Sequence, residues 1–159
     1  MAVPEKGSFA PDFELPRDSG ETLRLSSLRG KPVVLYFYPK DDTSGCTVEA
    51  VDFSTRKADF EALGAVILGV SPDSVKSHDK FKCKHELTID LLSDTEKEVI
   101  QAYGLWVEKS MYGRKYMGVE RSTFLIDANG VIAESWIKVK IPGHVDAVLQ
   151  ATKKLVQAA

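Results

Sequence analysis

The stretch VVLYFYPKDDTSGC constrains the fold of this chain more than any other segment. Residues 33–38 are β-branched or aromatic with no polar position, which is typical of a central strand covered on both faces. Pro39 ends this strand, because proline cannot donate a hydrogen bond to a neighbouring strand. From about Thr43 to Leu63 the pattern becomes helical, and Cys46 lies near its start. The stretch therefore predicts a buried strand that delivers a thiol to the beginning of a helix.

Strand and helix patterns alternate through the rest of the chain. Before this stretch, apolar patches at 13–15 and 23–25, separated by a polar segment with a glycine, predict a hairpin. After it we expect, in order, a strand at 65–70, a helix at 73–85, a strand at 89–92, a helix at 95–103, a long loop at 106–119, strands at 122–126 and 131–137 joined by Asp-Ala-Asn-Gly, and a helix at 144–157.

This order predicts the α/β class. Alternating units at the start predict a parallel core, and the late hairpin adds an antiparallel edge. We therefore expect a thioredoxin-like fold, with a mixed, mainly parallel central sheet and helices on both faces. A length of 159 residues is that of one ordinary domain, so residues 1–159 are expected to form a single domain.

Composition argues against two classes of partner. Lysine and arginine number 21 against 23 acidic residues, and this near balance gives no electrostatic footprint for nucleic acid. The longest apolar runs are too short to span a bilayer, and residues 1–10 lack the apolar stretch of a secretory signal. We therefore expect a cytoplasmic protein with no nucleic-acid or membrane partner. In that setting two cysteines indicate catalytic, redox or buried thiols rather than a disulfide scaffold.

Cys46 needs stabilisation of its anion to be reactive, because a free cysteine with a pKa of about 8.5 is mostly protonated at neutral pH. The first turn of a helix offers unpaired amide groups and the positive end of the helix dipole. Thr43 can present its hydroxyl to the sulfur or to a bound peroxide oxygen. Arg121 is the candidate cation, since a guanidinium could hold both the thiolate and the oxygen that gains charge as an O–O bond breaks.

Three of the surrounding residues have simpler alternatives. Glu49 falls within roughly 40° of the phenylalanine stripe of the helix, as Cys46 does, so it could orient Arg121 through an ion pair or be an ordinary carboxylate of the first turn. Thr43 could cap the helix as well as touch a substrate. Pro39 is expected to be structural, because it ends the strand and closes a small pocket.

These residues resemble the signature of peroxiredoxins. Pro39, Thr43 and Cys46 reproduce Pro-x-x-x-Thr-x-x-Cys, and Arg121 in ERSTFLID matches the active-site arginine of that family. LYFYPKDDTSGCTVEA and MYGRKYMGVERSTFLID are similar to the bacterioferritin comigratory protein, or PrxQ, subfamily. The resemblance covers nearly the whole chain. It implies a thioredoxin-fold, commonly monomeric enzyme that reduces hydrogen peroxide and organic hydroperoxides without metal or bound cofactor, usually with electrons from thioredoxin.

One position departs from many members of this subfamily. They carry a resolving cysteine five residues after the first one, where this chain has Val51. Another branch places it in the next helix, where Cys83 lies in KFKCKHEL, so the resemblance implies an atypical two-cysteine enzyme with a Cys46–Cys83 disulfide. On a helix over 73–85, Cys83 projects roughly 160° from Phe81, away from the core. The alternative is an incidental surface thiol.

The disulfide would require movement. Its Cα atoms must lie within about 7 Å, and helices across a sheet edge seldom start that close. We therefore expect local unwinding of one or both helices when Cys46 and Cys83 join.

Other candidate sites are weaker. His78, Cys83 and His85 match no closed zinc motif, so no metal site is expected. The lysines of the same helix are expected to be a solvated surface. Tyr112, Tyr116 and Met117 could rim the active site, contact the reductant or simply pack.

Three functions compete at this point. A peroxidase uses Cys46 as nucleophile and Cys83 as the residue that condenses with the sulfenic acid. A thiol-disulfide oxidoreductase on the same fold would be expected to carry Cys-x-x-Cys, which the sequence lacks. A non-enzymatic redox sensor could use the same reactive cysteine to report peroxide to a partner.

Overall fold

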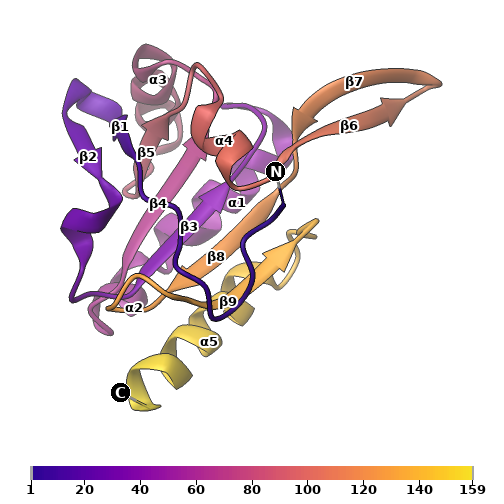
Figure 1. The fold of residues 1–159 in the computed structure, drawn as a ribbon. Coiled ribbons are helices and arrows are strands. Elements are labelled where there is room, and N and C mark those ends of the chain that lie inside the picture. The colour runs from indigo at the N-terminus through magenta and orange to yellow at the C-terminus, as the bar shows by residue number, and fades with distance from the viewer. Residues whose placement is uncertain (1, 159) are drawn as a thin grey trace.

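A five-stranded mixed sheet forms the centre of the structure, a computed structural model that describes residues 2–158 (Figure 1). In spatial order the strands are β5 (Asp90–Ser93), β4 (Val66–Ser71), β3 (Val33–Phe37), β8 (Ser122–Ile126) and β9 (Ile132–Ile137). The pairs β3–β4 and β4–β5 are parallel, whereas β3–β8 and β8–β9 are antiparallel. The central strand β3 thus joins the parallel and the antiparallel halves of the sheet.

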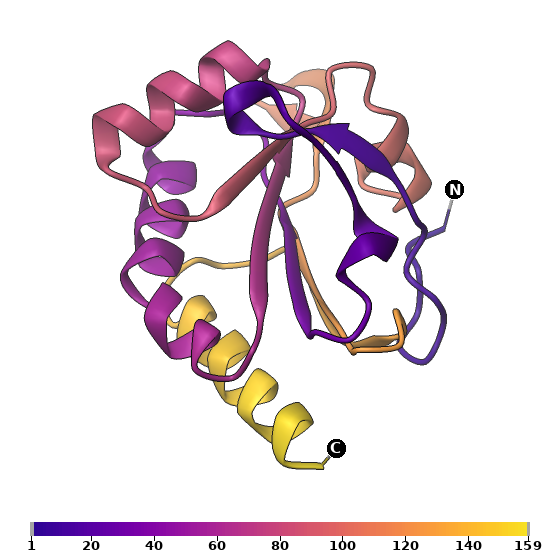
Figure 2. The ribbon, with the colours of Figure 1, turned by 90° about the vertical axis from the view of Figure 1, so that its left-hand side faces the viewer.

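Both faces of the sheet are covered, which explains why β3 is buried at all of its five positions. Four helices pack on one face: α1 (Ser44–Thr55), α2 (Lys57–Glu61), α3 (Val75–His85) and α5 (His144–Ala158). The opposite face carries α4 (Glu98–Ala102) and the N-terminal segment, as the turned view shows (Figure 2). The predicted α/β class and thioredoxin-like fold are confirmed.

Successive side chains of β3 point alternately to the two faces of the sheet, so this strand contributes to the hydrophobic core on each face. Val34 and Tyr36 pack with the phenylalanines of α1, α2 and α3, whereas Val33, Leu35 and Phe37 pack with α4 and the N-terminal segment. Successive side chains of a strand point to opposite faces, so a strand without polar positions is what a sheet covered twice requires.

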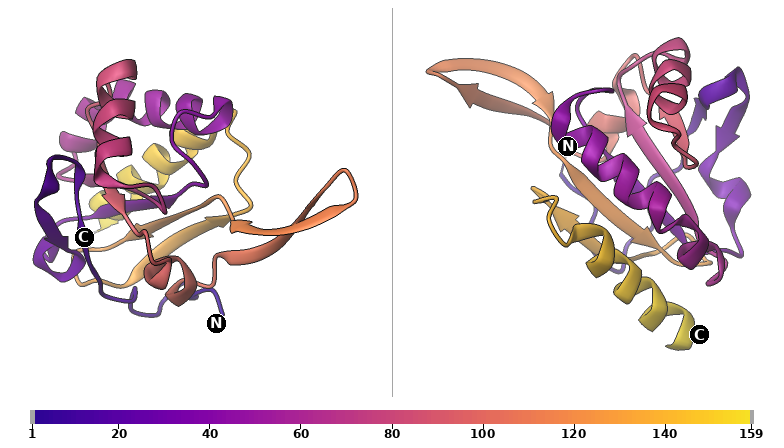
Figure 3. Two further views of the ribbon diagram at one scale, coloured as in Figure 1. Left: turned by 90° about the horizontal axis from the view of Figure 1, so that it is seen from above. Right: turned by 180° about the vertical axis from the view of Figure 1, so that it is seen from behind.

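Two further hairpins lie outside the central sheet. The predicted N-terminal hairpin pairs β1 (Glu14–Pro16) with β2 (Thr22–Arg24). A short 3₁₀ turn follows each of them, η1 (Asp18–Gly20) after β1 and η2 (Leu25–Leu28) after β2. The second hairpin, β6 (Trp106–Met111) and β7 (Arg114–Val119), projects from the body as an arm (Figure 3). The prediction of a long loop over 106–119 was wrong.

The reason for this error is the exposure of the arm. Both of its faces meet solvent, so its sequence lacks the alternation that reveals a half-buried strand. Tyr112 and Gly113 form its turn with φ angles of 51° and 77°, as a two-residue hairpin turn with both central residues left-handed requires.

Helix boundaries also differ from the predicted ones. The helix expected to Leu63 is interrupted at Arg56, where φ and ψ are −97° and 5°, and the stripe of Phe53 and Phe60 cannot reveal such a break because both remain buried. Helix α3 begins after Ser74 instead of at residue 73, because the Ser74 hydroxyl accepts a hydrogen bond from the Ser77 amide. The helix expected at 95–103 is shorter, since α4 spans only 98–102. Within residues 2–158, no helix combines the length and the apolar character needed to cross a bilayer.

Gly69 of β4 leaves room for the large side chain of Tyr36 on the neighbouring strand. A Cβ at Gly69 would lie 2.8 Å from Tyr36 Cζ and 2.9 Å from Leu91 Cδ2. We expect Gly69→Ala to lower the free energy of unfolding by about 1–3 kcal/mol, because overpacking a core forces its neighbours to shift. Urea unfolding followed by circular dichroism measures this loss.

Gly118→Ala is the matched control for this substitution. Gly118 also lies in a strand, but the nearest atoms to an added Cβ belong to the flexible Lys109 side chain at 3.3 Å and to the exposed Tyr116 ring. The free energy of unfolding of the Gly118→Ala variant should stay close to that of the unmodified chain. Equal effects of the two substitutions would contradict the packing argument.

Candidate active site

The candidate site lies at one edge of the central sheet, where β3 ends and β8 begins. Because the two strands are antiparallel, with Phe37 opposite Ser122, Arg121 falls at the same edge as the loop between β3 and α1. The start of α1 carries Cys46 in its first turn. Strand register therefore brings together two residues that are 75 positions apart in the chain.

Arg121 bridges a thiol and a carboxylate. Its Nη2 donates to Cys46 Sγ at 3.1 Å, and its Nη1 donates to Glu49 Oε1 at 2.7 Å. Cys46 is only 2 % exposed and Glu49 is fully buried, whereas the Arg121 side chain keeps 17 % of its surface exposed. Cys46 and Glu49 are three residues apart on one helix face, so a single guanidinium can contact both.

The charges of this cluster depend on one another. Burial raises the pKa of Glu49 to about 7, although Arg121 opposes this shift. For Arg121, burial disfavours the cation, but Glu49 and Cys46 outweigh this effect and raise the pKa of the guanidinium. Arg121 therefore stays charged, whereas Glu49 changes its charge close to neutral pH.

Thr43 and Pro39 lie next to this cluster without joining its hydrogen bonds. Thr43 is the residue before the first turn of α1, but its hydroxyl accepts no bond from a helix amide and instead donates to the Lys40 carbonyl at 2.9 Å. Thr43 is exposed, so the lone pairs of its hydroxyl are open to a ligand at the helix start. Pro39 is half-buried and follows the last residues of the β3 ladder.

Two residues around the Cys46–Arg121 cluster were not found from the sequence. Ile141, in the loop after β9, contacts the helix start so closely that a Cβ on Gly45 would lie 3.1 Å from its Cδ1. His144 lies behind Arg121 and pairs with the Thr123 hydroxyl at 2.8 Å. Burial and the charge of Arg121 lower the pKa of His144 to about 4, so it is neutral at physiological pH. Neither residue belongs to a motif that could have identified it.

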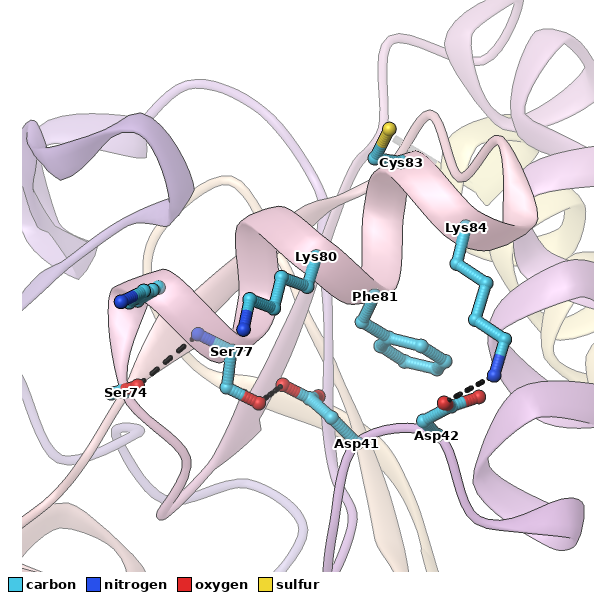
Figure 4. Close-up of a pocket in the computed structure, with 9 residues that line it drawn as sticks. Asp41, Asp42, Ser74, Ser77, Lys80, Phe81, Cys83 and Lys84 are labelled. Carbon is cyan, nitrogen blue, oxygen red and sulfur yellow. Dashed lines mark hydrogen bonds and ion pairs between the residues drawn. The ribbon is translucent and has the colours of Figure 1, made fainter.

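Cys83 lies on α3, away from Cys46. Both cysteines are free thiols, and Cys83 is exposed where Cys46 is buried. Figure 4 shows its sulfur on the side of the helix opposite Phe81. An open groove of about 720 Å³ runs along this part of α3 and is lined by Cys83, Phe81, the loop aspartates and the lysines of the helix. The structure thus does not bring the two cysteines together.

A buried network between α3 and the loop before α1 was also missed. His78 is fully buried and its Nδ1 lies 2.7 Å from Asp41 Oδ2, while Tyr38 donates to Asp41 Oδ1 at 2.6 Å. The sequence offered a signal, because His78 lies three residues before Phe81 on the core stripe. A role as metal ligand, for which the spacing of His78, Cys83 and His85 fits no motif, gives no indication of this network. Among residues 2–158, no three His, Cys, Asp or Glu side chains are placed to hold a metal ion.

The geometry at Cys46 suits nucleophilic attack on a polarised O–O bond. Arg121 Nη2 and the amides of the first helical turn are the donors next to the sulfur, where they can stabilise negative charge. The same guanidinium can stabilise the oxygen that leaves, because it has five donors. In a site of this kind a hydroperoxide oxidises the thiol, and this reaction needs no metal.

Comparison with known proteins identifies one family. The model of the AhpC/TSA family matches residues 7–135. Peroxiredoxin Bcp of Bacillus subtilis is 52% identical over 151 residues, which cover 95% of this chain and 96% of that protein. A putative peroxiredoxin Bcp of Coxiella burnetii is 52% identical over 145 residues, or 91% of this chain and 96% of the relative.

Solved structures agree with this assignment. Peroxiredoxin Q of Xanthomonas campestris superposes with a TM-score of 0.88 at 43% identity, covering 98% of both chains. A bacterioferritin comigratory protein from the same organism, studied for its alkyl peroxide reduction activity, has a TM-score of 0.88 at 42% identity and covers 98% of this chain and 99% of its own.

The ionisation of Glu49 predicts a pH dependence for the oxidation of Cys46. As the pH falls through about 7, Glu49 gains a proton and its ion pair with Arg121 is lost. We expect the rate constant for oxidation by hydrogen peroxide to fall with it. Glu49→Gln should lower that rate constant at alkaline pH by about tenfold, the value of one hydrogen bond to a charged group, and remove this step from the pH profile.

Stopped-flow mixing with hydrogen peroxide across the pH range measures both effects. Glu61→Gln, which removes an exposed carboxylate from α2, is the control and should keep the original profile. If Glu49→Gln oxidised at the original rate with the original profile, Glu49 would have no role in holding Arg121.

Proposed function

The chain belongs to the AhpC/TSA family, as a peroxiredoxin of the bacterioferritin comigratory protein type, and we propose that Cys46 is the thiol that carries its peroxidase activity. The observation that carries this proposal is the 3.1 Å contact between Cys46 Sγ and Arg121 Nη2 at the start of α1. Cys46 attacks the terminal oxygen of a hydroperoxide, so that an S–O bond forms and the O–O bond breaks. The displaced alkoxide or hydroxide takes up a proton, and Cys46 becomes a sulfenic acid.

The neighbours of Cys46 have distinct roles in this step. Arg121 stabilises first the thiolate and then the displaced oxygen, while Glu49 holds the guanidinium in place. The exposed hydroxyl of Thr43 contacts the bound peroxide, and Pro39 limits the site on the side of β3. Together these residues favour the peroxidase over the sensor and the thiol-disulfide oxidoreductase as the activity of this site.

Cys83 completes the cycle. Its thiol attacks the sulfenic sulfur, an S–S bond forms, the S–O bond breaks, and the Cys83 proton leaves with the hydroxide as water. Thioredoxin or a similar dithiol then reduces the Cys46–Cys83 disulfide. The exposure of Cys83 and its location on α3 beside Lys76 and Lys80 support this role, because a resolving thiol must be accessible.

The remaining properties follow the same proposal. The substrates are hydrogen peroxide and organic hydroperoxides, and the enzyme works as a cytoplasmic monomer without a bound cofactor. The intact site within one chain supports the monomer, because Cys46, Arg121 and Glu49 need no residue from a second copy.

Replacing each cysteine separates the two steps. Cys46→Ser should abolish peroxide reduction, because serine is a far weaker nucleophile at this position. Cys83→Ser should leave the oxidation of Cys46 unchanged and abolish thioredoxin-linked turnover. Stopped-flow oxidation and a coupled thioredoxin assay measure the two steps. Turnover that survived in Cys83→Ser would mean that an external thiol resolves the sulfenic acid.

Disulfide formation should loosen the two helices. Cys46 is buried in the first turn of α1 and Cys83 faces solvent from α3, so a bond between them is incompatible with both helices as they stand. We expect amide exchange at the start of α1 and in α3 to be faster in the oxidised protein than in the reduced one, and exchange in α5 to stay the same. Equal protection of α1 and α3 in both forms would contradict this expectation.

A further inference from the structure

A buried ion pair attaches α3 to the loop before α1. His78 of α3 lies with its Nδ1 2.7 Å from Asp41 Oδ2 and its Nε2 2.9 Å from the Leu92 carbonyl oxygen. Both side chains are almost fully inaccessible, with exposed fractions of 0% for His78 and 4% for Asp41. Asp41 lies two residues before Thr43, so this pair connects the helix of Cys83 to the loop that leads to Cys46.

The contacts of His78 favour the charged imidazolium. Both ring nitrogens face acceptors, a carboxylate and a backbone carbonyl, and only the doubly protonated ring donates to both. Tyr38 cannot replace one of these protons, since its hydroxyl donates to Asp41 at 2.6 Å. Burial opposes the charge on His78, but the hydrogen bond and charge of Asp41 outweigh it and raise the pKa of the ring.

The His78–Asp41 pair holds α3 in the orientation that keeps the Cys83 thiol exposed to solvent. His78 and Phe81 face the core, whereas Cys83 projects from the opposite side of the same helix (Figure 4). A rotation of α3 as a unit, or unwinding that extends to His78, would withdraw this side chain from Asp41 and Leu92. The cost of breaking a buried ion pair then contributes to the barrier for disulfide formation.

We propose that His78 is a positioning residue for the resolving step: its ion pair with Asp41 keeps α3 folded while Cys46 reacts with peroxide, and release of the pair limits formation of the Cys46–Cys83 disulfide. The proposal rests on the role assigned to Cys83 above. His78 touches neither the peroxide nor the reacting sulfurs, so it acts through the conformation of α3 alone.

Other charged groups hold α3 as well, but none is buried in the same way. Lys82 pairs with Asp18 of η1 at 2.8 Å with 21% of its side chain exposed. Lys84 and His85 both pair at 2.7 Å with Asp42, which lies in the exposed part of the loop. Asp73 accepts a hydrogen bond from the Asp41 amide and adds negative charge near His78.

The sign of the pH effect follows from the raised pKa. A group whose pKa is higher in the folded state stabilises that state fully below its unfolded pKa, and the contribution is lost as the pH rises through the folded pKa. The His78 contribution to the stability of α3 is therefore fully present below the ordinary pKa of histidine and declines as the pH rises through the raised pKa of His78. Disulfide formation should accelerate over the same range.

Single-turnover oxidation of the full-length protein, with samples quenched for mass spectrometry, separates sulfenic acid formation from disulfide formation. At a pH where His78 is charged, we expect His78→Gln to speed disulfide formation about tenfold or more, because one hydrogen bond to a charged group is lost. The rate should also rise less with pH in this variant than in the unmodified protein. A variant with the original rate and the original pH profile would overturn the proposal.

His85→Gln is the matched control, because it removes a histidine of the same helix that pairs with an aspartate of the same loop at the surface. It should keep the original pH profile, and equal acceleration in both variants would overturn a specific role of the buried pair. Amide exchange of α3 in the reduced, unmodified protein gives a second measurement that needs no variant. Its protection factor should decrease with pH while that of α5 does not, and constant protection would also contradict the proposal.

The two proposals fail in different ways. If the unmodified protein formed no Cys46–Cys83 disulfide after peroxide treatment, the assignment of Cys83 would be wrong, and the resolving role of His78 with it. If the disulfide formed at a rate that did not respond to His78→Gln, only the role of His78 would be wrong.

Discussion

The structure depends on the burial of a guanidinium between a thiol and a carboxylate at one edge of a sheet. A buried charge is costly unless it is paired, so Arg121 and Glu49 require each other. Removing either partner leaves the other charge without compensation in the interior. The thiol shares this arrangement, because the same Arg121 that pairs with Glu49 donates to Cys46 Sγ. The reactivity proposed for Cys46 thus depends on this packed sheet edge and on the register of β3 and β8.

Two ion pairs with opposite requirements meet at this edge. Arg121 directly precedes β8 and Glu49 lies on α1, and in the proposed reaction the two stay together while peroxide is bound. Asp41 lies in the loop before α1 and His78 lies on α3, and in our proposal their separation precedes formation of the Cys46–Cys83 disulfide. The two pairs differ in the kind of cation they use. An arginine keeps its charge at all physiological pH values, whereas a histidine can lose it. The cation of the Arg121 pair is therefore permanent, and the His78 pair can be weakened by deprotonation of the histidine.

Much of this arrangement could be predicted from the sequence, and the failures have physical causes. The strand, the proline and the helix around Cys46 carry strong local signals, and family resemblance selected Arg121 from a distant part of the chain. The arm of β6 and β7 was missed because neither of its faces is buried, so nothing in 106–119 alternates. The ion pair of His78 was not predicted, because its partner Asp41 lies in another element and the apolar stripe around His78 does not point to it. Contacts between segments distant in sequence leave no periodicity to detect.

The burial of Cys46 has opposite effects on the two steps of the proposed catalytic cycle. Peroxide reduction favours a folded α1, because only the intact first turn and the closed sheet edge place amides and Arg121 around the sulfur. The resolving step proposed for Cys83 favours the opposite state, because Cys46 is only 2 % exposed whereas the Cys83 thiol is exposed on the outer side of α3. A more stable α3 would protect the reactive geometry but would prolong the sulfenic acid, which a second peroxide can oxidise further. A buried ion pair suits both steps, because its strength changes with protonation and α3 can thus be held or released. The hydrophobic contacts of Phe81 do not change with protonation.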